Sequence, residues 1–478
     1  MFGISQTILK GGVKDIMRVL LIVYDNGSYI HWFPQGLAYI ASVLRNEGYY
    51  VEIYNQDMHH YPDEHLTEYL NKNRFDVIGV SMIAGYYQYR KLLRISDAIN
   101  SSKHRPFYIL GGHGSAPEPE YFIKKTKADA IIIGEGEETI VDLMAAIGSQ
   151  SSLENIEGIA YRDDDKTVIN KRRSLIKDID SIPFPSYDLF PMEYYRLLRM
   201  PHMNNTDFAI PMLSGRGCPF KCTFCYRMDE GFRPRGNESI IEEIKLLQRN
   251  YNISYIAFGD ELLMSSEKRT ISLCEDFIKA NLNIKWDCNG RLNFAKPDVL
   301  KLMKMSGCVF INYGIEAMED EVLKNMRKSL TTKQIIKGIE NTLNVGISPG
   351  FNIIFGNIGD NKETLSKGVD FLLKYDDGAQ MRTIRPVTPY PGCDLYYYAI
   401  EKGLLKDCED FYENKHINSD LVSVNFTDMS DAEFHCCLLE ANTKLIKNYL
   451  QKRTSASINS AKKLYLGKDA SFRGFRQL

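Results

Sequence analysis

Three cysteines stand close together in the segment Ser214-Gly-Arg-Gly-Cys-Pro-Phe-Lys-Cys-Thr-Phe-Cys-Tyr226, with the spacing C-x3-C-x2-C. Cysteine thiolates are the soft ligands that iron–sulfur clusters require. Cys218, Cys222 and Cys225 can therefore bind three irons of one [4Fe–4S] cubane, which leaves the fourth iron open to another ligand. A closed zinc site would need a fourth cysteine or histidine nearby, and none is adjacent, since the closest is His202.

The first ~150 residues alternate between strand and helix patterns. Alternation of this kind predicts an α/β fold with a doubly wound parallel sheet, whose ligands bind beyond the carboxyl ends of the strands. Glycine-rich turns at residues 25–28, 111–115 and 134–137 follow three of the expected strands and allow a ligand to approach the backbone closely. The expected strands are 19–24, 51–54, 77–81, 108–110 and 130–133, and the expected helices are 35–47, 64–72, 88–100, 118–125 and 138–147.

The alternation stops after residue 150 and restarts near Phe208. A hairpin (158–162 and 167–170) and a proline-rich extended segment (182–191) occupy the interval. Six strand–helix units then follow, too few for a closed eight-unit barrel, so we expect a partial barrel. After Gly403 the pattern is less regular and ends in one amphipathic helix, about 431–451. The expected barrel strands are 209–213, 255–258, 284–288, 309–313, 350–354 and 381–384.

Composition narrows the class of protein. The net charge of −2 over 478 residues gives no sign of nucleic-acid binding. No apolar run reaches the ~18 residues that span a bilayer, and no signal peptide is recognisable. Ten cysteines in a chain of this kind indicate reduced thiols. We therefore expect a cytoplasmic protein without a membrane span.

The cysteine segment resembles the signature of the radical S-adenosylmethionine (SAM) superfamily, including an aromatic residue, Phe224, before the last cysteine. The resemblance implies a partial (β/α)6 barrel with the cluster loop after its first strand. It also implies that SAM binds the open iron and is reductively cleaved to a 5′-deoxyadenosyl radical. By the same resemblance, the residues expected to contact SAM are Phe224, Asp260, Glu261, Arg291, Glu316 and Asn352.

The N-terminal half, taken together with this core, is similar to the cobalamin (B12)-binding branch of the superfamily, the branch of the anaerobic magnesium-protoporphyrin IX monomethyl ester cyclases and class B methyltransferases. The matching stretches include 34–48, 111–113, 134–139 and 386–392. Many cobalamin domains supply an axial histidine after the first strand, but here Gly27 stands at that position. Cobalamin would therefore bind without this histidine, or the domain is only a scaffold. The residues expected to contact cobalamin are Gln35, Ser81, Met82, Gly111, Gly112, His113, Gly134, Glu135 and Gly136.

The resemblance gives a domain division that the structure can be compared with. We expect an N-terminal extension, a Rossmann-like cobalamin-binding domain, a hairpin and proline-rich connector, a radical SAM core, and a small, mainly helical region that caps the substrate. The corresponding residues are 1–16, 17–150, 151–205, 206–400 and 401–478.

The leading functional hypothesis is a radical SAM enzyme that uses a [4Fe–4S] cluster, SAM and cobalamin to methylate an unactivated carbon of a small molecule or natural product. A flavodoxin or ferredoxin would supply electrons. The main alternative is a cyclase, oxidase or ring-rearranging enzyme with the same cofactors. A methylthiotransferase would need further cysteines before Cys218, and there are none. A non-catalytic cobalamin or iron–sulfur protein is the remaining alternative. The substrate, the lower ligand of cobalt and the oligomeric state stay open.

Overall fold

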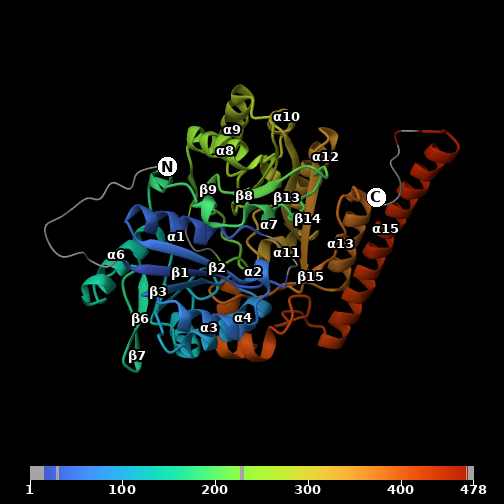
Figure 1. Cartoon of the computed structure of the whole chain (residues 1–478). Helices are drawn as coiled ribbons and strands as arrows, with labels where there is room; N and C mark the ends of the chain where they lie inside the picture. Colours follow the sequence, from blue (N-terminus) through green and yellow to red (C-terminus); the bar gives the residue numbers. More distant parts are fainter. Residues whose placement is uncertain (1–15, 28–31, 227–230, 470, 472–478) are drawn as a thin grey trace.

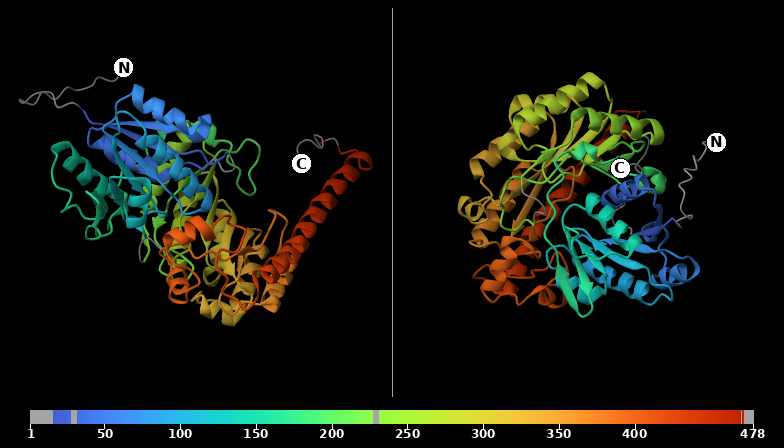
Figure 2. Two further views of the ribbon diagram at one scale, coloured as in Figure 1. Left: turned by 90° about the horizontal axis from the view of Figure 1, so that it is seen from below. Right: turned by 90° about the vertical axis from the view of Figure 1, so that its left-hand side faces the viewer.

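The computed structural model describes residues 16–27, 32–226, 231–469 and 471 and is built on two large, mainly parallel sheets (Figure 1). The extension expected at residues 1–16 lies outside the described residues, apart from Ile16. The first sheet and its helices form the N-terminal unit, and the second sheet forms the barrel. Views from two further directions show the two units packed against each other (Figure 2).

The N-terminal sheet has the order β2-β1-β3-β4-β5-β6-β7, in which the first five strands are parallel. The hairpin β6–β7 continues the sheet in antiparallel fashion, so it belongs structurally to this sheet, although we expected it in the connector. The strands are β1 (Arg18–Val23), β2 (Tyr50–Asn55), β3 (Val77–Ser81), β4 (Phe107–Gly111), β5 (Ala130–Ile132), β6 (Ile159–Asp163) and β7 (Lys166–Ile169).

Helices cover both faces of this sheet, which confirms the doubly wound α/β fold. Strand β1 has the apolar sequence RVLLIV, as expected for a parallel strand buried on both sides. Its odd-numbered side chains pack with α1 and α6, and its even-numbered side chains with α3, α4 and α5. The helices are α1 (Gln35–Asn46), α2 (Gln56–His59), α3 (Asp63–Lys72), α4 (Tyr86–Asn100), α5 (Pro119–Thr126) and α6 (Glu137–Ser149).

The connector crosses from one unit to the other through short helical turns, η1 (Ile179–Ser181), η2 (Tyr187–Leu189) and α7 (Met192–Tyr195). Phe33 of the N-terminal unit packs against three connector rings, those of Tyr187, Phe190 and Tyr195. The core on the α1 and α6 face is continuous, through these rings, with the core of the barrel. The two units therefore share one apolar core.

The second sheet is a partial barrel of six parallel strands in the order β15-β14-β13-β12-β11-β8. Its strands are β8 (Ala209–Met212), β11 (Tyr255–Phe258), β12 (Lys285–Gly290), β13 (Cys308–Glu316), β14 (Ser348–Phe355) and β15 (Arg385–Pro386). A small hairpin, β9 (Gly215–Arg216) and β10 (Arg233–Pro234), follows β8. The helices are α8 (Asn237–Tyr251), α9 (Glu267–Ala280), η3 (Leu292–Phe294), α10 (Pro297–Met305), α11 (Asp320–Asn325), α12 (Thr332–Asn344) and α13 (Lys362–Tyr375).

The sixth strand lies later in the chain than expected. Residues 381–384 form no strand, and pairing with β14 begins at Arg385. The backbone N–H and carbonyl of Ile384 are bonded instead to the side-chain amide of Asn442. The prediction for residues 381–384 was therefore wrong because a helix from the end of the chain satisfies this backbone.

The C-terminal region divides between the two units. Two of its elements pack on the N-terminal unit: helix α14 (Asp394–Glu401) and the π-helix η4 (Asp410–Lys415). There the ring of Tyr412 stacks on that of Tyr89, with 4.6 Å between the ring centroids. The Glu413 carboxylate accepts from Tyr89 and Arg90 and pairs with Lys125. Helix α15 (Asp431–Tyr465) runs along the outside of α13 and extends past the end of the predicted 431–451 helix (Figure 1).

Candidate cofactor sites at the interface of the two sheets

The cysteine segment is a loop closed at its base by the antiparallel β9–β10 hairpin. Arg216 of β9 lies opposite Arg233 of β10 in the strand register. Cys218 is half-buried, Cys222 is buried and Cys225 is exposed. Two backbone bonds fix the middle of the loop: Thr223 donates to the Met326 carbonyl at 3.0 Å, and its own carbonyl accepts from Leu395 at 2.9 Å. The barrel and α14 thus hold the cysteine loop from two sides.

Cations from the barrel surround the thiols. The Arg291 guanidinium, beyond the end of β12, lies 3.5 Å from the centroid of the Phe220 ring and donates to the Lys328 carbonyl. A hydrogen bond from Cys225, together with the charges of Lys328 and Arg291, lowers the pKa of Cys222 to about 6. Burial raises the pKa of Cys218. The hydrogen bond with Cys222 and burial raise the pKa of Cys225. Of the three cysteines, Cys222 is therefore the one whose surroundings favour the thiolate, the form that binds iron.

Glu316 and Lys328 form a buried ion pair beside these cysteines. The Lys328 Nζ lies 2.8 Å from the Glu316 Oε1, and each side chain is 9% exposed. Glu316 has a left-handed backbone with φ 68° at the end of β13. A Cβ added at Gly314 would lie 2.3 Å from the Glu316 carboxylate, so a larger residue there would displace the ion pair. We did not expect Lys328 at the site, because its role depends on the carboxylate that the fold places beside it.

The other residues expected to contact SAM take different positions. Asp260 is buried and accepts from the backbone of Ser214 and Gly215, so its carboxylate fixes the strand that leads into the cysteine loop. Burial raises its pKa to about 6. Glu261 is exposed. Asn352 is exposed and donates to Asn312, which in turn donates to Asn289, so an amide ladder crosses three barrel strands. The centroid of the Phe224 ring lies 6.0 Å from the Lys328 Nζ.

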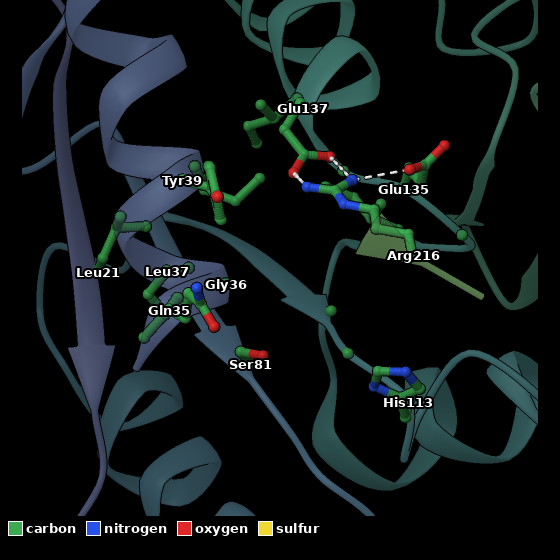
Figure 3. Close-up of a pocket in the computed structure, with 18 of the residues that line it drawn as sticks. Leu21, Gln35, Gly36, Leu37, Tyr39, Ser81, His113, Glu135, Glu137 and Arg216 are labelled. Atoms are coloured by element: carbon green, nitrogen blue, oxygen red, sulfur yellow. Dashed lines mark hydrogen bonds and ion pairs between the residues drawn. The ribbon is translucent and has the colours of Figure 1, made fainter. Parts of the chain in front are cut away.

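A cavity of about 360 Å³ lies beyond the carboxyl ends of the N-terminal strands, a size typical of small-molecule sites (Figure 3). Its apolar wall is formed by side chains of the sheet and of α1 and α6. Residues of the barrel, Gly217 and Glu261 among them, close its other side. The expected cobalamin contacts that line it are Gln35, Ser81, Gly111, Gly112, His113, Gly134, Glu135 and Gly136.

Met82 is the expected cobalamin contact that does not line the cavity. Its side chain is buried at 1% exposure, and its backbone N–H donates to the Gly111 carbonyl at 2.8 Å. A Cβ at Gly112 would meet the Met82 carbonyl oxygen at 2.4 Å. Met82 therefore supports the glycine turn from beneath.

Both sites fit the groups that the sequence implies. The Nε atom of Arg291 and the Nε2 atom of Gln35 are buried donors without a hydrogen-bond partner within the described chain. Gln35 lines the cavity, and the charge of Arg291 acts on the Cys222 thiol. A Cβ at Gly36 or Gly111 would meet nothing within 4 Å, so these glycines leave open space in the cavity wall. Cys218, Cys222 and Cys225 supply the sulfur ligands of a cluster.

Within the described residues, no three histidine, cysteine, aspartate or glutamate side chains converge as a single metal ion would require. A cubane differs, because each of its cysteines binds a different iron. No helix in the same part of the chain is long and apolar enough to cross a bilayer.

Glu135 and Glu137 form ion pairs across the interface between the two units. Arg216 Nη1 lies 2.7 Å from Glu135 Oε1, and Arg216 Nη2 lies 2.5 Å from Glu137 Oε1 (Figure 3). Arg233 Nη1 lies 2.8 Å from the other Glu135 oxygen. Sequence reasoning expected Glu135 to contact a cofactor. The structure shows that both of its carboxylate oxygens bind arginines of the barrel hairpin.

Family comparisons agree with this two-part architecture. Residues 27–144 match the B12 binding domain family, and residues 212–372 match the Radical SAM superfamily. The two matches cover the unit that holds the cavity and the unit that holds the cysteines.

Relatives match across both units. An uncharacterized methyltransferase of Pyrococcus horikoshii is 31% identical over 401 residues, which cover 82% of this chain and 84% of the relative. The anaerobic magnesium-protoporphyrin IX monomethyl ester cyclase of Rubrivivax gelatinosus is 28% identical, over 83% of this chain and 72% of the cyclase. The structure of the radical S-adenosylmethionine methyltransferase TsrM from Kitasatospora setae, with cobalamin and a [4Fe–4S] cluster bound, has a TM-score of 0.67 at 16% identity, covering 81% of this chain and 75% of TsrM.

Proposed function

The chain belongs to the radical SAM enzymes that carry a B12-binding domain, and we propose that it methylates an unactivated carbon of a small molecule or natural product. A [4Fe–4S] cluster, SAM and cobalamin are the cofactors expected of this family. The reducing electron would come from a flavodoxin or ferredoxin. The proposal concerns the reaction type and the substrate class.

One observation carries the proposal: the cavity of the N-terminal sheet and the cysteine loop adjoin. Arg216 and Gly217, the two residues before Cys218, line the cavity, as do Asp260 and Glu261, which follow the next barrel strand. A group bound in the cavity would therefore lie beside a group bound to the cysteines. Transfer of a methyl group between two cofactors and a substrate needs such proximity.

When bound, the cluster supplies the electron that cleaves SAM, and cobalamin supplies a carrier for the methyl group. The protein's part is to bind and orient. Cys218, Cys222 and Cys225 would hold the cluster, and the unpartnered Nε of Arg291 would donate to the carboxylate of SAM. Lys328, paired with Glu316, and Arg291 place positive charge beside the Cys222 thiol.

The N-terminal unit would hold cobalamin through backbone and short polar groups. Gly111, Gly112 and Gly134 bring the main chain to the cavity wall without side chains, and Ser81 and the Gln35 amide offer polar atoms. Leu21, Ile109 and neighbouring apolar side chains also line the cavity.

The test is a product assay on the full chain, reconstituted anaerobically with iron, sulfide and hydroxocobalamin and then mixed with SAM and a chemical reductant. Methylation consumes two molecules of SAM, so we expect both 5′-deoxyadenosine and S-adenosylhomocysteine. Cys222→Ala should abolish 5′-deoxyadenosine, whereas Cys436→Ala, which removes an exposed cysteine on α15, should not. Absence of 5′-deoxyadenosine from the wild-type chain would contradict the proposal.

Similarity to the Rubrivivax gelatinosus cyclase favours a second candidate, a non-methylating cyclase, oxidase or ring-rearranging enzyme with the same cofactors. The same assay separates the two candidates. Formation of 5′-deoxyadenosine without S-adenosylhomocysteine would favour the second candidate over methylation.

A further inference from the structure

The base of the cysteine loop is anchored to the N-terminal unit, not only to the barrel. Strands β9 and β10 enter and leave the segment that carries the three cysteines, and Arg216 and Arg233 are paired residues on these strands. Glu135 reaches both, with Oε1 on Arg216 and Oε2 on Arg233. One carboxylate of the cavity rim therefore joins the two strands at the point where the loop closes.

Glu137 adds a fork-to-fork contact on Arg216. Its Oε1 lies 2.5 Å from Nη2 and its Oε2 accepts from Nη1 at 3.2 Å. This bidentate geometry fixes the direction of the guanidinium as well as its position. Glu135 also accepts from the backbone N–H of Ile176 at 2.8 Å, so the connector contributes to the same cluster of contacts.

The four charged side chains are largely withdrawn from water. Exposure is 6% for Glu135, 9% for Glu137, 15% for Arg216 and 17% for Arg233. Two carboxylates face two guanidinium groups, so the charges of these four side chains balance. Removal of one partner would leave an uncompensated charge in a buried place, and the remaining side chains would have to rearrange.

Three members of this network also line the cavity: Glu135, Glu137 and Arg216. At the other end of the cysteine segment, the Tyr226 ring meets the His113 ring edge-on at 6.2 Å, and His113 lines the same cavity. Residues next to the first and the last cluster cysteine therefore both contact loops that form the cavity.

We infer that Glu135 and Glu137 are positioning residues that couple the cavity to the cysteine loop, so that cobalamin and the iron–sulfur cluster each strengthen the binding of the other. The inference rests on the proposed function, because it requires both cofactors. A ligand that fills the cavity orders the rim loop, the rim loop fixes Arg216 and Arg233, and these fix the base of the cluster loop. Coupling of this kind is reciprocal by thermodynamic necessity.

The test compares the dissociation constant of hydroxocobalamin for the full chain with and without the reconstituted cluster. For the wild type we expect the cluster to tighten cobalamin binding about fivefold or more. The ratio of the dissociation constant without the cluster to that with the cluster measures the coupling. In Glu135→Gln this ratio should fall toward one, because the neutral amide cannot hold both arginines. Glu137→Gln, which leaves Glu135 in place, should give an intermediate ratio and serves as the second variant if Glu135→Gln does not fold.

Asp188→Asn is the matched control, since Arg45–Asp188 is also an arginine–carboxylate pair between the N-terminal unit and the connector, and neither residue lines the cavity. It should keep the wild-type ratio. A purely structural role for Glu135 would weaken cobalamin binding equally with and without the cluster, and that result would overturn the inference. A wild-type ratio of one would also overturn it while leaving the proposed function intact. A wild type that binds no cobalamin would overturn both.

Discussion

At the scale of single residues, two buried carboxyl groups of the barrel differ in their surroundings. Glu316 has Lys328. Asp287 on β12 is 7% exposed, and its Oδ2 has no hydrogen-bond partner among the described residues. Burial therefore raises the pKa of Asp287 to about 7. Such a carboxyl group is tolerated when protonated and costs free energy when ionised.

We predict that Asp287→Asn stabilises the protein at pH 8 by about 2 to 4 kcal/mol. The wild-type group, whose folded pKa is raised, contributes its full stability below the unfolded pKa near 4. That contribution is lost as the pH rises through about 7. The advantage of the asparagine should therefore shrink between pH 7 and pH 4. Thermal unfolding midpoints of both proteins across this range provide the measurement.

Asp298→Asn is the control for the pH series, because the Asp298 side chain is 96% exposed and its substitution should change the midpoint little at any pH. An Asp287→Asn variant that is less stable than the wild type at pH 8, or whose advantage does not depend on pH, would contradict the assignment.

Residues differ in how far their role can be predicted from the sequence. The three cysteines are recognisable because their spacing alone lets them share one cluster. Arg216 and Lys328 were not identified, because an arginine or lysine gains a role only from the carboxylate that the fold places beside it. Glu135 was identified as part of a cofactor loop, but its partners lie 81 and 98 positions later in the chain.

At the scale of elements, the ends of the strands β3, β4 and β5 form the cavity because they carry glycine or small polar residues. Gly111 is the last residue of β4 and pairs with Ser81 of β3. A Cβ at Gly111 would meet nothing within 4 Å. A larger side chain at this position would therefore not clash with the protein, but it would occupy part of the cavity.

We predict that Gly111→Val retains the fold and the iron content but binds hydroxocobalamin about tenfold more weakly, since overfilling a site costs ~1 kcal/mol or more. Valine suits a strand, so the sheet should tolerate it. Titration of the reconstituted variant, followed by absorbance, gives the affinity. Thr167→Val, on β7 of the same sheet and outside the cavity, should bind like the wild type. Unchanged affinity in Gly111→Val would place cobalamin elsewhere.

Most strands could be predicted from their apolar runs, because parallel strands buried on both faces have a strong local pattern. The sixth barrel strand could not. The backbone of Ile384 is hydrogen-bonded to the side chain of Asn442 of α15, 58 positions away, and the residues that pair with β14 are Arg385 and Pro386. The length of α15 was also underestimated, because its second half lacks the apolar periodicity that marks a helix in a sequence.

At the scale of the whole molecule, the C-terminal region contacts both units, and its role as a cap over the substrate stays a prediction. We expected residues 401–478 to cap the substrate. Helix η4 packs on the N-terminal unit through Glu413 and Tyr412. Helix α15 packs along α13, and its Phe434 also contacts Phe355 at the end of β14. The sequence could not predict this because both contacts depend on residues far apart in the chain.

The central claim is that one chain holds an iron–sulfur cluster and cobalamin at adjoining sites, and the iron and cobalamin content of the reconstituted protein tests it most directly. We predict about four irons and one cobalamin per wild-type chain. Cys222→Ala should lose the iron yet retain cobalamin at saturating concentration, and Cys436→Ala should keep both. A wild-type chain without iron or without cobalamin, or iron that persists in Cys222→Ala, would contradict the account.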